Sequence, residues 1–570
     1  MSVTDWIVLV VTLLTIVVYG IYKSRGNRNI DGYLLGNQSL PWYHVCLSVM
    51  ATQASAITFL SAPGLAYSSG MSFVQFYFGL PLAMIVLCIT FVPIFHRLKV
   101  FTAYEFLEKR FDMKTRALTA FLFLIQRGLS TGITIYAPSI ILSTILNIDT
   151  TYTTIFIGSL VIIYTVYGGT KAVSYTQLLQ MSIIFSGLFV AGIMVVHLLP
   201  SNVGFSDALH IAGKMGRTNA IDFSFDWNNQ YTVWSGLIGG FFLQLSYFGT
   251  DQSQVGRYLT GSSVSQSRLG LLMNGLVKIP MQFLILLIGI LVFAFYQFNE
   301  PPVFFNRYEL NKLEKSSYAG ELAAIKQDYS NAFREKQIHV KALEQSIESD
   351  NEELIAANRT VLAEADTKMK AIRKSAVDLM EKNDADADTN DNNYIFLSFV
   401  TQYLPQGLIG LLIAIIFLAS MGSTASALNS LTSTTVVDIY KRHIHKTGSD
   451  RRYLDVSRLT TLVWGGFCIT MAMYASKLGN LIEAVNILGS LFYGTILGIF
   501  LIAFYFKKIG GTATFIAALI TEVLIFGIWW AEIMAFLWLN VVGCVLVILI
   551  GYIVQKFEVK TGQQITTDRL

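Results

Sequence analysis

Long apolar runs separated by short basic loops dominate the pattern of this chain. A helix needs about 20 apolar residues to cross the hydrocarbon core of a bilayer. The pattern therefore predicts an all-α polytopic membrane protein with about 13 transmembrane helices. The predicted spans are 5–22, 44–69, 72–97, 117–146, 153–167, 178–198, 233–250, 270–297, 406–435, 459–477, 480–505, 512–530 and 532–555.

Composition narrows the class of protein. The 570 residues are 53% hydrophobic and only 14% charged, whereas soluble proteins carry about 25% charged residues. These values exclude a cytosolic enzyme, a nucleic-acid binder and a secreted disulfide scaffold. The 4 cysteines lie in apolar runs without metal-ligand spacing, so we expect buried hydrophobic side chains. No acid, base and nucleophile are grouped in the sequence, so we expect no enzyme.

Lys and Arg in the short loops predict the orientation, because cytoplasmic loops are enriched in both. Each basic loop follows an odd-numbered span, as in 97–116 and 441–452. We therefore expect the N-terminus outside, the C-terminus in the cytoplasm, and a location in the plasma (inner) membrane.

One polar segment interrupts the apolar pattern. Residues 300–392 hold 19 acidic and 13 basic residues, and apolar positions recur there at helical spacing. They follow the eighth predicted span and should lie outside. A solvated helical hairpin is the favoured interpretation, and a docking module for a protein partner is the alternative.

The remaining spans divide into two groups of five helices, over 44–198 and 233–505, the second interrupted by 300–392. Residues 1–43 would form a leading helix and inner loop, and 506–570 two trailing helices and a short inner tail. Because five is odd, the two groups would enter the membrane from opposite faces, as in transporters built from inverted repeats.

The first helix of each group is polar near its middle. Unsatisfied polar groups are costly in hydrocarbon, so these clusters predict a central binding site; interhelical hydrogen bonding is the alternative. The clusters contain Gln53, Ser55 and Thr58 in one helix and Gln244, Ser246 and Tyr247 in the other.

The ninth span contains a run of small and hydroxyl residues, 419–430. Such a run supplies neutral oxygens for a monovalent cation, or allows close helix packing, and composition alone leaves both open. Ala51 and Ala54 precede the expected break in the second span and could add carbonyl oxygens.

Five stretches, in this order, resemble the sodium/solute symporter family, whose members couple sodium to glucose, iodide, monocarboxylates, proline or sialic acid. They are "ATQASAITFLSAPGLAY" (51–67), "TGITIYAPSIIL" (131–142), "YGGTKAVSYTQLLQ" (167–180), "TDQSQVGRYL" (250–259) and "SMGSTASALNSLTSTTVVDIY" (420–440). The resemblance implies a LeuT-like 5+5 inverted repeat and Na+ as the coupling ion.

The resemblance also implies a sodium site between the second and ninth spans. Its ligands would be the carbonyls of Ala51, Ala54 and Ala419 and the hydroxyl of Ser423. Relatives usually carry another hydroxyl where this chain has Gly422, so either the Gly422 carbonyl or Thr424 would take that place.

A second departure concerns the number of sodium ions. Relatives with a second sodium use an acidic residue where this chain has Gln177, and a hydroxyl where it has Ala425 beside Ser426. A neutral site that lacks one hydroxyl binds a cation less well, so we expect one sodium per cycle.

The substrate-binding positions are also taken from the resemblance. Positions that contact sugar in sugar-transporting relatives match Gln53, Thr58, Tyr77, Gln244, Lys278 and Asn486. Tyr77 replaces a carboxylate of those relatives, which argues against a sugar. Tyr247 and Phe248 match an aromatic gate pair, with core packing as the alternative. Ser55 and Tyr247 complete the predicted substrate set.

Arg127 is the most informative residue of the predicted site. It lies about 15 Å along its helix from Arg116, or half a bilayer, which argues against a side chain that reaches the membrane surface. A guanidinium at this depth could hold a carboxylate. Lys278 is a second candidate cation.

The sequence thus predicts a sodium-coupled symporter that imports a small organic anion, such as a sialic acid or a monocarboxylate, with one sodium by alternating access. A sodium/sugar symporter is one alternative. A transporter-like sensor that recruits a protein through the outer hairpin is another.

Overall fold

The computed structural model describes residues 1–24, 38–98, 100–349 and 351–560. These residues form helices, and an isolated parallel bridge joins Leu40 to Gly261. The first half contains α1 (Val3–Ser24), α3 (Trp42–Gln53), α4 (Ala56–Ser69), η2 (Met71–Tyr77), α5 (Leu80–Val86), η3 (Leu87–Phe91), α6 (Val92–Leu98), α7 (Glu105–Arg110), α8 (Met113–Leu146), α9 (Thr150–His197), α10 (Phe205–Lys214), η4 (Ser235–Gly239), α11 (Gly240–Thr250), α12 (Gln252–Tyr258) and α13 (Val264–Phe298).

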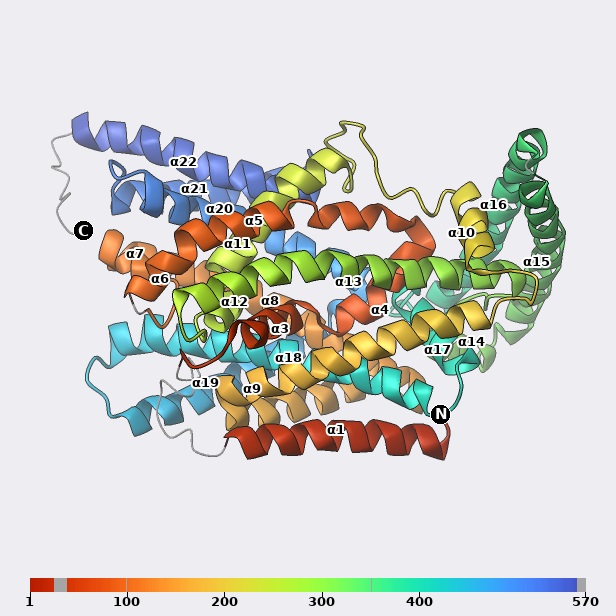
Figure 1. Ribbon diagram of the computed structural model, residues 1–570, viewed down its shortest axis with the longest axis horizontal. Helices are drawn as coiled ribbons and strands as arrows, with labels where there is room; N and C mark the ends of the chain where they lie inside the picture. Colours follow the sequence, from red (N-terminus) through yellow and green to blue (C-terminus); the bar gives the residue numbers. More distant parts are fainter. Residues whose placement is uncertain (25–37, 99, 350, 561–570) are drawn as a thin grey trace.

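The second half begins with the polar insertion and returns to the membrane (Figure 1). It contains α14 (Arg307–Glu314), α15 (Ala319–Glu348), α16 (Glu352–Asn383), η5 (Asn392–Tyr394), α17 (Ile395–Tyr403), α18 (Leu408–Thr434), η6 (Thr435–Ile444), α19 (Asp450–Ala472), η7 (Ala475–Leu478), α20 (Leu481–Tyr505), α21 (Gly511–Trp530) and α22 (Phe536–Lys560).

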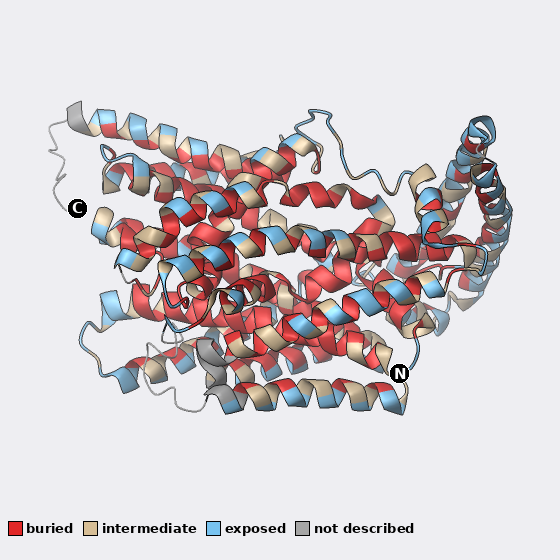
Figure 2. Cartoon of the chain, in the orientation of Figure 1, coloured by how far each residue is buried: buried red, intermediate tan, exposed pale blue. Residues whose placement is uncertain are grey.

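The described residues include 9 helices that are long and apolar enough to cross a membrane, and the bent pair α3–α4 makes up to 10. Large apolar side chains are exposed along α1, α21 and α22, which is the pattern of helices that face lipid. The expected all-α polytopic class is confirmed. Figure 2 shows the contrast between a buried bundle interior and exposed outer faces.

Helix α9 covers two of the predicted spans, 153–167 and 178–198. In a straight helix Tyr164 and Thr176 would lie about 18 Å apart, yet their hydroxyl oxygens are 3.1 Å apart in a hydrogen bond. The chain therefore reverses direction between these two residues, as two antiparallel spans require.

Two helices near the centre are broken. The α3 and α4 axes differ by 61°, because Ala54 (φ −81°, ψ 85°) and Ser55 (φ −89°, ψ 177°) leave the helical conformation. Likewise α11 ends and α12 begins at Asp251 (φ −76°, ψ 117°). The polar clusters identified in the sequence lie beside these breaks.

The polar insertion forms a long two-helix hairpin, α15 and α16, at one end of the bundle (Figure 1). Its apolar positions pack together between the helices, whereas most other positions are exposed. Lys336 and Asp366 pair across the hairpin at 2.6 Å, and Lys214 of α10 reaches Glu352 at 3.2 Å. The expected helical hairpin is present.

A short linker, residues 384–394, connects the hairpin to α17 and rests on α4. A Cβ added to Gly64 would lie 2.0 Å from the carbonyl oxygen of Asn392, so only glycine permits this approach. Lys477 pairs with Asp386 of the linker at 2.9 Å. The insertion is thus held against α4, the second half of the first broken helix.

Candidate functional site

A central cavity lies between the two helix breaks, α8, η2, α18 and α20. It encloses about 780 Å³ of empty space, part of it open to solvent. Its lining combines side-chain amides, hydroxyls and aromatic rings with one charged group, Arg127, which suits a small polar solute. The lining residues are Thr52, Gln53, Ser55, Ile57, Thr58, Phe76, Tyr77, Gln126, Arg127, Thr134, Leu243, Gln244, Tyr247, Ser423, Ala427, Ile482, Val485, Asn486 and Tyr493.

Most of the residues predicted to bind substrate line this cavity. They are Gln53, Ser55, Thr58, Tyr77, Arg127, Gln244, Tyr247 and Asn486. The amide of Gln244 is fully buried and has no hydrogen-bond partner among the described residues. A buried amide without a partner costs free energy, so a ligand that satisfies it is favoured.

Two predicted residues lie behind the cavity wall. Phe248 is fully buried and packs edge-on against Tyr247, with ring centroids 5.0 Å apart. The Lys278 ammonium is fully buried and lies 5.8 Å from the centre of the Tyr77 ring. Lys278 has no hydrogen-bond partner within the described part of the chain. Tyr77 thus separates this cation from the cavity.

The first break exposes the two backbone oxygens expected to bind sodium. In an unbroken helix the Ser55 and Thr58 amides would donate to the Ala51 and Ala54 carbonyls. Instead Ser55 donates to the Gln53 carbonyl at 3.1 Å, and Thr58 donates to the Ser55 carbonyl at 3.0 Å. The break therefore releases the Ala51 and Ala54 carbonyl oxygens from their helical donors.

Ser423 of α18 lines the same cavity as this break. Its hydroxyl donates within its own helix, to the Ala419 carbonyl at 2.9 Å and to the Ser420 carbonyl at 3.1 Å. A hydroxyl that donates its proton retains oxygen lone pairs for a cation. Thr424 is buried, and its hydroxyl has no hydrogen-bond partner in the described ranges.

Gln177 of α9, the position at which the resemblance implies a carboxylate in relatives with a second sodium, is fully buried and hydrogen-bonded. Its Nε2 donates to the Gly422 carbonyl at 3.3 Å, to the Ser426 hydroxyl at 3.1 Å and to the Thr52 hydroxyl at 3.3 Å. Its Oε1 accepts from the Ser48 hydroxyl at 2.6 Å. The Gln177 amide therefore already contacts the oxygens of Gly422, Ser426 and Thr52.

Arg127 has a protein carboxylate as its partner, which the sequence analysis did not identify. Its Nη2 lies 2.7 Å from Oδ2 of Asp251, at the second helix break. Asp251 also accepts from the Tyr493 hydroxyl at 2.9 Å and from the Ser253 hydroxyl at 2.6 Å. An acid inside a membrane span is a functional candidate by default, and this signal could have identified Asp251.

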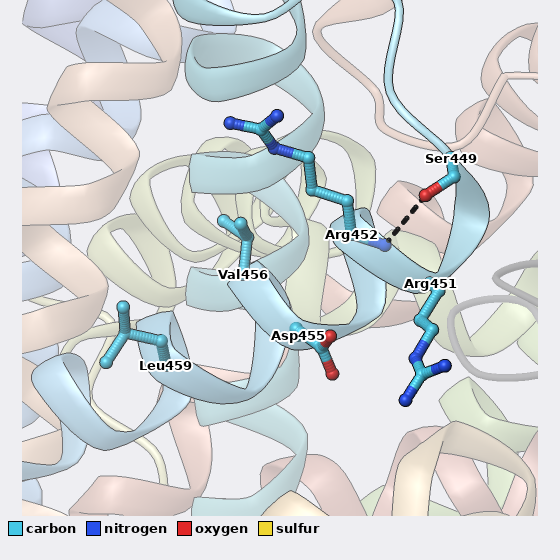
Figure 3. A pocket seen from close by; sticks show the side chains of 6 residues that line it. All are labelled: Ser449, Arg451, Arg452, Asp455, Val456 and Leu459. Atoms are coloured by element: carbon cyan, nitrogen blue, oxygen red, sulfur yellow. Dashed lines mark hydrogen bonds between the residues drawn. The ribbon is translucent and has the colours of Figure 1, made fainter.

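A second hollow lies at the start of α19, away from the breaks. Figure 3 shows Ser449 accepting a hydrogen bond from the Arg452 backbone, 3.4 Å long, as an N-terminal cap. Arg451 and Asp455 beside it are exposed. This hollow is the surface of a helix end and contains none of the predicted site residues.

The broken helices and the enclosed polar cavity define a membrane transporter with a LeuT-like fold. Comparison with known families then gives the identification. The Sodium:solute symporter family matches residues 33–308 and 375–521, and the chain belongs to that family. The unmatched part between these ranges lies within the polar insertion.

Named relatives differ in their solutes. The chain is 26% identical over 523 residues to "Sodium-coupled monocarboxylate transporter 1" of Xenopus laevis, covering 91% of this chain and 70% of that protein. It is 24% identical to "Sodium/sialic acid symporter NanT" of Aliivibrio fischeri, covering 96% and 92%. It is 32% identical to the human "Sodium/iodide cotransporter", covering 48% and 42%.

A solved structure supports the same fold. The "Substrate-bound outward-open state of a Na+-coupled sialic acid symporter" superposes with a TM-score of 0.75 at 21% identity, covering 98% of both chains. The protein is therefore an integral membrane symporter that uses Na+ and a small-molecule substrate. Its family and these neighbours are transporters and not enzymes.

Proposed function

We propose that this protein imports a small organic anion, a sialic acid or a monocarboxylate, together with one sodium ion. The observation that carries the proposal is Arg127, a buried guanidinium that lines the central cavity. Its Nε has no hydrogen-bond partner among the described residues, so the group retains donors for a carboxylate. Sialic acids and monocarboxylates, which two relatives are named for, both carry one.

The proposed sodium site consists of neutral oxygens. It uses the Ala51, Ala54 and Ala419 carbonyls and the Ser423 hydroxyl. The carbonyls released at the first break support this assignment. The missing fifth ligand is assigned to Thr424, because the Gly422 carbonyl already accepts hydrogen bonds from Gln177 and from Ser426.

One sodium per cycle follows from the surroundings of Gln177. Its amide already donates to the oxygens of Gly422, Ser426 and Thr52, and it has no negative charge to balance a second ion. One sodium that enters across 100 mV gains about 2.3 kcal/mol from the field. A monovalent anion that enters with it loses the same amount, so the transported pair is electroneutral and the sodium concentration gradient alone drives uptake.

The proposed orientation has the N-terminus outside and the C-terminus in the cytoplasm of the plasma (inner) membrane. The basic loops after odd-numbered spans support it. The hairpin of α15 and α16 then lies outside, and the cavity fills from that side.

The test is solute uptake into reconstituted vesicles with an imposed sodium gradient. The panel is N-acetylneuraminate, pyruvate, lactate, glucose, galactose and proline. We expect sodium-driven uptake of one of the anions, and loss of that uptake in Arg127→Gln while sodium still stabilises the protein. Arg359→Gln, a change at an exposed hairpin arginine, is the matched control. Unchanged anion uptake in Arg127→Gln would defeat the proposal.

A sugar is the second candidate substrate. Gln53, Thr58, Gln244 and Asn486 line the cavity together and offer amide and hydroxyl groups. Tyr77 weakens this candidate, because the position lacks the carboxylate of sugar-transporting relatives. Sodium-driven uptake of glucose or galactose that survives Arg127→Gln would favour the sugar.

A further inference from the structure

We infer that Arg127 and Asp251 form the inner closure of the transport path and that the substrate anion opens it by competing with Asp251 for Arg127. The inference rests on the proposed function for the identity of the competing anion. The closure itself depends only on the ion pair.

The pair lies in the partition between two cavities. Arg127 lines the central cavity. A smaller polar cavity adjoins it, lined by Gln252, Ser253, Gly256, Arg257, Ser426, Asn429, Ser430 and Ser433. Arg127 donates directly to the Ser253 hydroxyl. The side-chain contact between Arg127 of the central cavity and Ser253 of the smaller cavity is therefore the contact that closes the central cavity.

The pair also joins elements that must separate when the path opens. Arg127 belongs to α8, whereas Asp251 lies at the break between α11 and α12. Tyr493 of α20 donates to the same carboxylate oxygen as Arg127, and the Tyr247 ring lies 5.5 Å from the guanidinium carbon. Three helices thus converge on one buried carboxylate.

The cost of opening depends on what replaces each partner. Separating a buried ion pair leaves both charges without compensation, which is strongly unfavourable. Asp251 would retain the Tyr493 and Ser253 hydroxyls and the Ser253 amide, at 2.9, 2.6 and 2.8 Å. Those groups would not compensate the charge of Arg127. A substrate carboxylate is the group that replaces the Asp251 carboxylate as its partner. Binding of the anion therefore favours the open inner path.

The second cavity continues the path inward. It is formed by α12 and by the part of α18 that follows Ser423, toward the cytoplasmic end in the proposed orientation. Its lining combines hydroxyls and amides with the cation Arg257, which suits a hydrated anion. An anion released from Arg127 would enter a polar space rather than a packed interior.

The experiment measures access to the central cavity from the cytoplasmic side. The native cysteines are all buried, so the reporter is Ala427→Cys on α18, in the central cavity. A membrane-impermeant thiol reagent is applied to inside-out vesicles. The control reporter is Gly256→Cys in the second cavity, where an added Cβ meets only Gln252 Nε2, at 3.6 Å.

We expect slow labelling of Ala427→Cys in the parent and labelling about tenfold faster or more when Asp251→Asn is added. The Gly256→Cys rate should be unchanged. The exchange of charges, Arg127→Asp with Asp251→Arg, should restore slow labelling. An Asp251→Asn protein that still elutes as a monodisperse species yet labels at the parent rate overturns the closure.

A second arm tests the competition. N-acetylneuraminate or pyruvate, added with sodium, should accelerate Ala427→Cys labelling in the parent and leave it unchanged in Arg127→Gln. If neither anion changes the parent rate although Asp251→Asn does, the competition is overturned and the closure stands. If Asp251→Asn has no effect while anion uptake proceeds, the closure fails and the proposed function stands.

Discussion

The two helix breaks of this protein are chemically opposite. At the first break, between α3 and α4, the polar groups are backbone carbonyls, the Ser423 hydroxyl that lines the same cavity and the Gln177 amide that donates to Thr52, all neutral. At the second, between α11 and α12, Asp251 and Arg127 carry full charges. Neutral oxygens hold a small ion that must leave again, whereas buried charges hold each other strongly and separate only when a substitute arrives.

The largest effect is expected at the charged break. Asp251→Ala removes the partner of buried Arg127 and should lower the free energy of unfolding by about 3–5 kcal/mol. The double change Arg127→Met with Asp251→Leu removes both charges and should recover most of this loss. Chemical unfolding of the purified protein measures both values. Equal stability of Asp251→Ala and the parent would show that the ion pair makes no net contribution to the free energy of unfolding.

A charge placed at the neutral break should change the number of sodium ions. Gln177→Glu replaces an amide donor with a carboxylate beside Ser426 and Thr52. The buried negative charge is unfavourable unless a cation binds beside it. We expect the sodium dependence of uptake to become steeper, with a Hill coefficient that rises from about 1 toward 2. Gln327→Glu, the same change at an exposed position of α15, is the control. A Hill coefficient near 1 in Gln177→Glu contradicts the amide-for-cation interpretation.

Removal of one neutral oxygen should weaken sodium without abolishing it. Ser423→Ala deletes a proposed ligand, and the loss of one such contact corresponds to about 1 kcal/mol, or roughly fivefold in sodium affinity. Ser433→Ala removes a hydroxyl further along α18, which also donates within the helix, and should leave the sodium affinity unchanged. The sodium titration of thermal stability measures both. An unaltered titration in Ser423→Ala excludes it from the site.

The smallest effect is expected outside the membrane. Burial in the linker raises the pKa of Asp388 to about 6, although Tyr394 and Tyr136 donate to it at 2.9 and 3.4 Å. A raised carboxyl pKa stabilises the fold at low pH, and this contribution is lost as the pH rises through about 6. The effect of Asp388→Asn on the free energy of unfolding, relative to the parent, should therefore be more stabilising at pH 7 than at pH 4, by about 1 kcal/mol. Melting temperatures over pH 4–7 show whether this dependence disappears in the variant.

The class of fold was predictable because membrane-length apolar runs and basic loops are local patterns. The central cavity could also be predicted from the sequence, because polar residues such as Gln53 and Gln244 within apolar helices indicate a binding site. Arg127 was identified from its depth alone. Its partner Asp251 was not, because the two residues belong to different helices far apart in the sequence and no local pattern links them. The neighbouring contact between Arg127 and Ser253 likewise joins residues 126 positions apart.

Gln177 shows a second limit of the sequence. The missing carboxylate was evident from the resemblance, and one sodium was expected from it. That the amide reaches the Gly422 carbonyl depends on how α9 packs on α18, which tertiary contacts decide. The same packing supports the proposal of Thr424 rather than the Gly422 carbonyl as the fifth ligand, a choice that the sequence left open.

The contact between the linker and Gly64 connects the hairpin of α15 and α16 mechanically to the first broken helix. The Asn392 backbone touches α4 at Gly64, and the linker that contains Asn392 continues into the hairpin. In the proposed orientation, an antibody fragment that binds the tips of α15 and α16 would lie outside the cell and would be connected through the linker to one half of the first broken helix. Such a reagent would slow turnover without entering the solute pathway, and it would add recognisable mass for imaging the particle.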